Sequence, residues 1–202
     1  IRDRIGNIIG SVMVFHDVSK DSRLFRQLSY QASHDTLTGL INRREFENRL
    51  FAALDSIRDN AEHNHALLYV DLDQFKVVND TFGHTAGDAL LQRIAEIVHS
   101  KIRSSDILAR LSGDEFIIIL GQIDDQLSVQ RVCQELLSSL SQPLQLGSEK
   151  VHITASIGVS FYPSDATDIE ILLRNADQAM YSAKGQGRDR YQFFTPELQE
   201  RA

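Results

Sequence analysis

The order in which strand and helix patterns follow one another limits the possible folds of this chain more than any other feature of its sequence. Four segments carry apolar strand patterns, at residues 67–71, 107–111, 116–120 and 151–161. Two longer segments carry apolar side chains at helical spacing, at residues 87–101 and 129–140. The central order is therefore strand, helix, strand, strand, helix, strand.

This order predicts the split βαβ arrangement of ferredoxin-like folds, an α/β (α+β) domain with a central, mainly antiparallel sheet flanked by helices. A helix before the first strand is expected to begin at Asn42, with Glu45 in capping-box spacing. A last helix capped by Thr167 and a short strand over residues 190–194 complete the domain. In this topology the third strand lies between the first two and antiparallel to them. The turn at residues 112–114 is therefore expected beside the end of the first strand.

Acidic residues gather at this predicted junction. Asp71 and Asp73 end the first strand, and Asp114 and Glu115 follow in the turn. Mg²⁺ is usually held by one or two carboxylates together with water and phosphate oxygens. Acidic residues are also common in turns and as helix caps, so the residue types alone leave a structural role open. Their pairing across neighbouring strands favours a metal site.

The charge and the apolar content exclude several classes of protein. A formal net charge of −7 over 202 residues argues against a nucleic-acid-binding surface, and the strands lack the stacking aromatics of an RNA-binding ferredoxin-like domain. The single cysteine, Cys133, falls on an apolar helix stripe and is expected in the core. The apolar runs are too short to span a bilayer, and the first residues show no signal-peptide pattern. We therefore expect this part of the protein in the cytoplasm, whether or not a longer parent protein is anchored in a membrane.

Four segments are expected along the chain. Residues 1–18 contain a Gly-Asn turn signal and a β-rich run, which predict a hairpin that resembles the last strands of a PAS sensory domain. Residues 19–34 have the pattern of an amphipathic linker helix. Such a helix either pairs with its copy in a dimer or lies on its own domain, and the sequence leaves both open. Residues 35–194 form the main domain, and residues 195–202 form a short connector.

The turn between the second and third strands carries a family signature. Residues 110–116, Arg-Leu-Ser-Gly-Asp-Glu-Phe, resemble the RxGGDEF motif of diguanylate cyclases, with Ser112 in place of the first glycine. Further blocks resemble the same family in the same order, at residues 35–43, 71–80, 82–88 and 183–188. The resemblance covers residues 35–194. It implies a fold like that of nucleotide cyclases and polymerase palms, and an enzyme that joins two GTP molecules into cyclic di-GMP.

The resemblance also implies the residues that carry the chemistry. Asp71 and Asp114 would hold Mg²⁺, or Mn²⁺ in its place, with help from the carbonyl of Leu72. Glu115 would assist the metal or the attacking hydroxyl. Attack of a 3′-hydroxyl on an α-phosphate needs metal ions that lower the pKa of the hydroxyl and neutralise charge on the leaving oxygen. Because two GTP molecules must face each other, a homodimer is expected.

The substrate-binding residues follow from the same resemblance. Asn79 and Asp88 match the guanine-reading pair, and Lys76, Lys184 and Arg188 match the phosphate-binding cations. A carboxylate accepts hydrogen bonds from N1–H and the 2-amino group of guanine, which adenine lacks, so GTP is favoured over ATP. A helix-start carboxylate and solvated surface cations are the structural alternatives for these residues.

A product-binding motif is expected upstream of the turn. Arg103 and Asp106 have the residue types and the spacing of the family's RxxD inhibitory motif, and Arg110 on the same strand is expected to help them hold cyclic di-GMP. The alternative is an arginine near a helix end followed by an aspartate that opens a strand. So short a pattern is common, and the spacing to the turn carries the inference.

Two readings of the whole domain stay open. Ser112 departs from the signature at a position where glycine allows a positive φ or a close approach of substrate. Residues 194–202 resemble the connector that precedes an EAL phosphodiesterase domain. The domain is therefore either an active cyclase with product feedback, or a catalytically weak or inactive regulatory module that binds GTP or cyclic di-GMP beside an EAL domain.

Overall fold

The computed structural model describes residues 4–6, 27–58 and 64–199. It separates into two units, residues 1–32 and 33–202, which we describe individually. In the first unit, residues 4–6 form a turn and residues 27–32 are helical, and the remainder of the predicted hairpin and linker helix lies outside the described residues. Among the described helices none is long and apolar enough to cross a membrane.

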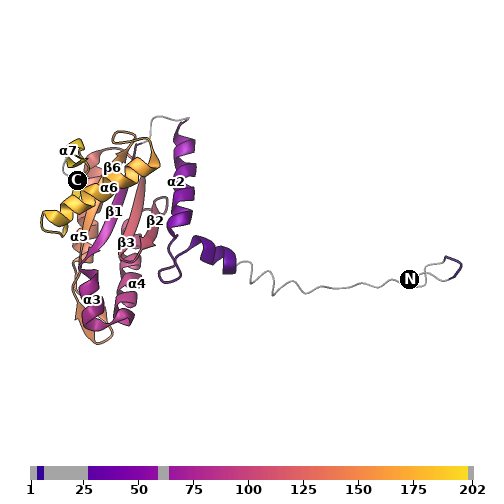
Figure 1. Ribbon diagram of the computed structural model, residues 1–202, viewed down its shortest axis with the longest axis horizontal. Helices are drawn as coiled ribbons and strands as arrows, with labels where there is room; N and C mark the ends of the chain where they lie inside the picture. The colour runs from indigo at the N-terminus through magenta and orange to yellow at the C-terminus, as the bar shows by residue number, and fades with distance from the viewer. Residues whose placement is uncertain (1–3, 7–26, 59–63, 200–202) are drawn as a thin grey trace. The chain divides into compact units, whose positions relative to one another are not determined.

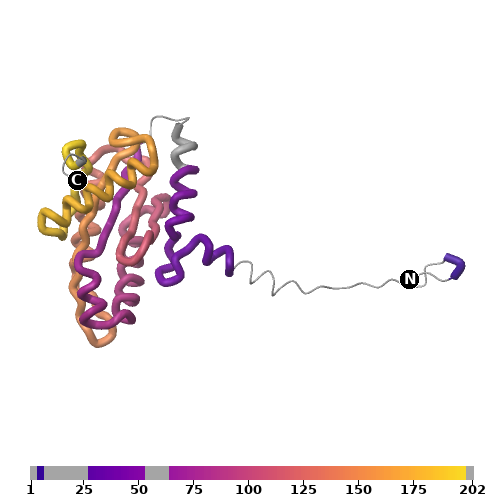
Figure 2. Tube along the Cα trace, viewed as in Figure 1, coloured from indigo at the N-terminus to yellow at the C-terminus, as the bar shows by residue number. Residues whose placement is uncertain are grey.

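The second unit is built on a five-stranded sheet with the order β2-β3-β1-β6-β7. Its strands are β1 (Asn64–Asp73), β2 (Ile107–Ser112), β3 (Glu115–Ile123), β6 (Thr154–Tyr162) and β7 (Arg190–Phe193). β3 lies between β1 and β2 and is antiparallel to both, β6 is antiparallel to β1, and β7 is parallel to β6. In Figure 2 the magenta segment of β1 lies among strands from later parts of the chain. The predicted ferredoxin-like core is confirmed, with β7 added at one edge.

Helices cover both faces of this sheet (Figure 1). On one face α2 (Arg43–Arg58) and α6 (Ile169–Gly185) pack against a cluster that includes Leu67 of β1 and Ile117 of β3. On the other face the helices are α3 (Phe75–Phe82), α4 (His84–Lys101) and α5 (Gln126–Leu140). They pack against a cluster that includes Leu68 and Ile118, because successive strand residues point to opposite faces. The buried Cys133 lies in this second cluster, as predicted.

The contact between α6 and β6 leaves no room for a side chain at Gly158. A Cβ atom built there would overlap the backbone oxygen of Ala176 and the backbone nitrogen of Met180 in α6. Close by, the hydroxyl of Ser160 donates to the carbonyl of Leu172 at 2.9 Å. The helix axis is therefore set directly against the strand, which fixes where the end of α6 reaches the sheet edge.

Several predicted boundaries were wrong. The helix α3 was not predicted, since eight residues are too few to show a clear helical period. The strand expected over residues 151–161 is two strands, because Val151 pairs with Leu144 in a separate hairpin of β4 (Leu144–Leu146) and β5 (Glu149–Val151). The last helix is capped by Asp168, whose side chain accepts from the Ile171 amide, rather than by Thr167.

Other local predictions were correct. The side chain of Asn42 accepts a hydrogen bond from the backbone amide of Glu45 at 3.0 Å, as the capping-box spacing predicted for the start of α2. A final short helix, α7 (Pro196–Gln199), lies in the segment expected to be a connector.

Candidate functional site

Acidic side chains from two strands meet at one end of the sheet. Asp71 near the end of β1 is the direct cross-strand partner of Glu115, the first residue of β3. The backbone amide of Leu72 donates to the carbonyl of Asp114 at 3.2 Å. The predicted convergence of the first strand with the signature turn is therefore present in the fold. We refer to Asp71, Asp114 and Glu115 as the carboxylate edge.

The electrostatics of the carboxylate edge centre on Asp71, which is only 7% exposed. The ammonium nitrogen of Lys184, near the end of α6, lies 2.7 Å from its Oδ1 atom. Burial raises the pKa of Asp71, and the charges of Asp114 and Glu115 raise it further, while Lys184 acts in the opposite direction. The site thus gathers like charges that a cation would stabilise.

Asp73 belongs to the supporting structure of this edge. Its two carboxylate oxygens accept hydrogen bonds from the hydroxyls of Ser156 and Thr154, each at 2.7 Å. One of them also accepts from the backbone amide of Asp189 at 3.1 Å. The side chain therefore ties the end of β1 to β6 and to the loop before β7, and its oxygens are engaged in these bonds.

The signature turn is braced by Arg110. The guanidinium donates from Nε to the carbonyl of Gly113 at 2.9 Å and from Nη1 to Asp35 Oδ1 at 3.0 Å. Burial acts to raise the pKa of Asp35, but hydrogen bonds from Thr38 and Arg110 outweigh it, and the pKa is lowered. Gly113 adopts a φ of 43°, which glycine tolerates in this tight turn. The start of the domain and the signature turn are thus held by one side chain.

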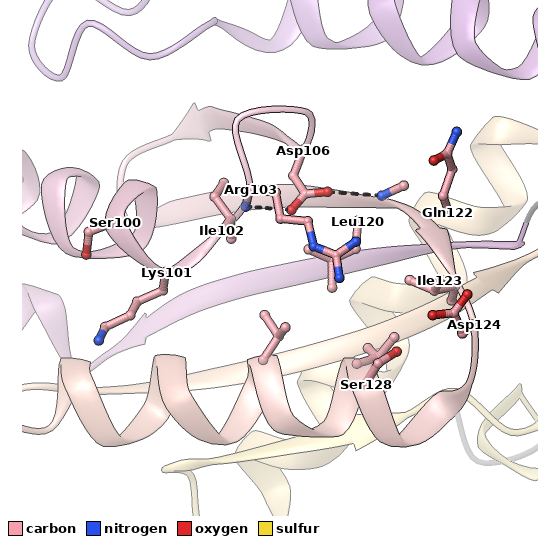
Figure 3. Close-up of a pocket in the computed structure, with 13 residues that line it drawn as sticks. Ser100, Lys101, Ile102, Arg103, Asp106, Leu120, Gln122, Ile123, Asp124 and Ser128 are labelled. Carbon is pink, nitrogen blue, oxygen red and sulfur yellow. Dashed lines mark hydrogen bonds between the residues drawn. The ribbon is translucent and has the colours of Figure 1, made fainter.

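The predicted product-binding residues are only partly brought together. Arg103 and Asp106 line a cavity of about 240 Å³ between the end of α4, the start of β2, the end of β3 and the start of α5 (Figure 3). Asp106 accepts from the backbone amides of Arg103 at 2.8 Å and Gly121 at 3.2 Å. Arg110 does not line this cavity, because its guanidinium is engaged by Asp35 and Gly113. The role of Arg110 in holding cyclic di-GMP therefore stays a prediction.

The predicted guanine readers lie on two consecutive helices. Asn79 is partly buried on α3, and Asp88 is exposed near the start of α4. Gly83, with a φ of 85°, joins the two helices. A Cβ atom at Gly87 would overlap the side-chain oxygen of Asn79, so glycine at this position leaves space for that amide.

The predicted phosphate-binding cations come from α3, from α6 and from the loop after α6. Lys76 is exposed on α3, and Lys184 lies on α6. Arg188 follows α6 with a φ of 64° and lines a pocket of about 360 Å³ together with Gln74 at the start of α3. Of these three cations, Lys184 forms an ion pair with the carboxylate edge, through Asp71.

Sequence reasoning missed two residues of this site. Asp35 opens one of the family-like blocks, and its spacing gave no sign that it pairs with Arg110, 75 positions later. Tyr69 lies on the same face of β1 as Asp71, and burial together with the charge of Glu115 raises its pKa. Alternation along the strand was the signal that could have placed Tyr69 beside the carboxylates.

The donor chemistry fits a divalent metal that completes its shell with other oxygens. In the part of the chain that the structure describes, no three His, Cys, Asp or Glu side chains come together as a metal site. Mg²⁺ seldom needs such a cage, because it retains waters and binds through one or two carboxylates plus substrate phosphates. The crowded carboxylates at Asp71 and Glu115 match that need.

Comparisons with known proteins agree with this geometry. The family model for the diguanylate cyclase GGDEF domain matches residues 32–190. The chain is 39% identical to the probable diguanylate cyclase DgcE of Escherichia coli over 193 residues, which are 95% of this chain and 17% of DgcE. Its structure is similar to the GGDEF domain of TpbB from Pseudomonas aeruginosa, with a TM-score of 0.79 and 36% identity, covering 83% of this chain and 97% of that one. It is also similar to the coiled coil and GGDEF domain of DgcB from Caulobacter crescentus in complex with c-di-GMP, with a TM-score of 0.78 and 26% identity, covering 87% of this chain and 93% of that one.

The sheet order and the carboxylate edge define a mixed α/β domain of the nucleotide-cyclase and polymerase-palm type. The chain belongs to the family of diguanylate cyclase GGDEF domains. It spans only 17% of the length of DgcE, so the likeness concerns this domain.

Proposed function

We propose that this domain condenses two GTP molecules into cyclic di-GMP and releases two diphosphates. The observation that carries the proposal is the cross-strand pairing of Asp71 with Glu115 beside Asp114, with Lys184 bound to Asp71. Carboxylates for a metal and a cation for phosphate thus lie at one end of the sheet. Family membership supports the same chemistry.

Four residues would hold the metal: Asp71, Asp114 and Glu115 through their carboxylates, and Leu72 through its carbonyl. Mg²⁺ is the expected ion and Mn²⁺ a substitute, since both prefer oxygen ligands. When bound, the metal would lower the pKa of the attacking 3′-hydroxyl and neutralise developing charge on phosphate oxygens. The protein itself supplies a buried, rigid Asp71 and a braced turn that orients Asp114 and Glu115.

The substrate would lie between α3, α4 and the end of α6. Asp88 and Asn79 would read the guanine edge, and Lys76, Lys184 and Arg188 would bind the phosphates. ATP would leave the acceptor oxygens of Asp88 unpaired, which discriminates strongly against adenine. These assignments rest on the match to the family's blocks and on the placement of both helices beside the carboxylate edge.

We expect purified chain given GTP and Mg²⁺ to form cyclic di-GMP, with a specific activity that rises with protein concentration. One domain offers one set of guanine readers, and the reaction needs two opposed substrates, so a two-fold dimer is the active species. Chromatography of the product over a concentration series, with the oligomeric state measured by light scattering, tests both points.

The outcomes separate the two readings of the domain. GTP binding by calorimetry without product at high protein concentration would favour the regulatory module, in which the domain passes a nucleotide signal to a neighbour. If product forms at a constant specific activity over concentrations at which the chain is monomeric, the proposed cyclase activity stands and the proposed active dimer is wrong.

We also propose that the cavity around Arg103 and Asp106 binds the product. A guanidinium offers several donors to guanine or phosphate, and Arg103 is exposed at the cavity rim. Bound product would hold two domains with their active sites apart. Asp106 is unsuitable for a test, because its carboxylate already satisfies two backbone amides.

Arg103→Ala should therefore relieve noncompetitive inhibition by cyclic di-GMP without lowering the maximal rate. The inhibition constant should rise at least about tenfold, since a hydrogen bond to a charged group contributes about 1.5–3 kcal/mol. Initial rates at several product concentrations measure this effect. Arg93→Ala, which removes an exposed arginine from α4, is the matched control. If the inhibition curves of Arg103→Ala and the unaltered chain superimpose, the motif has only a structural role.

The remaining organisation is proposed for the parent protein. Residues 1–18 would end a PAS domain, residues 19–34 would link it to the cyclase domain of residues 35–194, and residues 195–202 would connect to an EAL domain. A cytoplasmic position of this domain accords with its nucleotide substrate.

A further inference from the structure

We propose that Ser112 and Tyr69 are positioning residues that hold the carboxylate of Glu115 from two neighbouring strands. This inference rests on the proposed function, in which Glu115 acts at the carboxylate edge. Neither residue belongs to the metal, guanine or phosphate sets. Ser112 stands where the family signature has glycine, so its contact is a feature of this chain.

The first contact lies within the signature turn. The hydroxyl of Ser112 donates to Oε2 of Glu115 at 2.6 Å, a short bond of the kind formed between a hydroxyl and a carboxylate. Ser112 and Glu115 are also paired across the β2–β3 hairpin, just after a register shift between Arg110 and Ser112. The backbone pairing thus places the hydroxyl beside the carboxylate. A glycine at this position would have no side-chain donor.

The second contact comes from β1. Tyr69 and Asp71 lie on one face of the strand, and their cross-strand partners in β3 are Ile117 and Glu115. Tyr69 is therefore a diagonal neighbour of Glu115, within reach of a long side chain. The side chains of Tyr69 and Glu115 are hydrogen-bonded to each other. The phenol hydroxyl is the donor in this bond, because a carboxylate only accepts.

Two hydroxyls on one carboxylate restrict its rotamers. Glu115 is only partly buried, so without partners its side chain would sample several orientations at the sheet end. Donors from β1 and β2 hold the group on the side where Asp71 lies. Such supporting contacts typically change metal affinity or activity by about 10- to 100-fold when they are removed.

The test is a double-mutant cycle with Tyr69→Phe and Ser112→Ala, which delete one oxygen each. We expect each single variant to lower kcat about tenfold and the double variant up to about a hundredfold, with KM for GTP unchanged. Mn²⁺ titration followed by electron paramagnetic resonance, with a non-reactive GTP analogue bound, should show a parallel loss of affinity. Ser112→Thr, which retains the hydroxyl, should restore both quantities.

Matched controls remove the same groups elsewhere. Ser148→Ala breaks another serine–glutamate hydrogen bond, to Glu149 at 3.3 Å, and Tyr181→Phe removes a phenol that is 75% exposed. Thermal unfolding of every variant reports folding separately. Unchanged kcat and Mn²⁺ affinity in the double variant, or a change confined to KM, would overturn the proposal. If the unaltered chain makes no product, the proposed function fails, while the Mn²⁺ titration still tests the positioning of Glu115.

Discussion

Asp114→Ala should abolish synthesis of cyclic di-GMP while the domain stays folded. The loss should reach at least about a thousandfold, equivalent to about 4 kcal/mol of transition-state stabilisation, because the variant lacks a carboxylate that we propose as a metal ligand. The hydrogen bond from Leu72 goes to the backbone carbonyl of Asp114, which alanine keeps. Product chromatography measures the activity, and circular dichroism measures the fold.

Glu149→Ala supplies the control for this variant. Glu149 is exposed in the short β4–β5 hairpin, so its loss removes a carboxylate without touching the carboxylate edge. Full activity is expected. Substantial product from Asp114→Ala would remove that aspartate from the chemistry, and loss of the folded signal would mean that the turn needs its side chain for stability.

Gly158→Ala should strongly destabilise the domain. The added carbon would overlap backbone atoms of Ala176 and Met180, which can move only if α6 shifts away from β6. We expect the free energy of unfolding to fall by about 3 kcal/mol, at the upper end of overpacking effects. Urea denaturation followed by far-ultraviolet circular dichroism tests this expectation.

Gly121→Ala is the matched substitution, because Gly121 also lies inside a strand. Its added Cβ would meet only the ring of His65, at 3.6 Å, which is ordinary contact. A change below about 1 kcal/mol is expected there, since the glycine itself carries an entropic cost in a strand. Equal stability losses for the two variants would show that α6 can shift away from Gly158 at little cost in free energy.

The long periodic elements of this fold could be predicted from the sequence, and the short ones could not. The apolar runs of β1, β2 and β3 and the stripes of α4 and α5 gave the sheet order, because burial on two faces imposes a strong pattern. The helix α3 was not predicted because it has only eight residues and begins after Gln74, which has a left-handed φ of 57°. The break between β5 and β6 was not predicted because apolar and polar residues continue to alternate across it.

Within the site, the locations of the acidic residues could be predicted better than the hydrogen-bond partners of the side chains. The convergence of Asp71 with Glu115 followed from topology alone. The three bonds to Asp73 and the pairing of Arg110 with Asp35 depend on side-chain geometry between elements far apart in sequence, which periodicity does not encode. Arg110 was grouped with Arg103 and Asp106 because it lies on the same strand, and its contacts with Asp35 and Gly113 could not be predicted from spacing.

The brace formed by Asp35, Arg110 and Gly113 also bears on how such domains diverge. The two charged side chains are only 24% and 11% exposed, so replacing one partner leaves the other charge poorly solvated and without a counterion. A lineage that changes Asp35 alone would carry a destabilised turn until position 110 changed as well. The blocks at residues 35–43 and 110–116 are separated by α2, β1, α3 and α4, yet they should be inherited as one unit. Exchange of the amino-terminal block between homologous domains should succeed only when both residues of the ion pair are exchanged together.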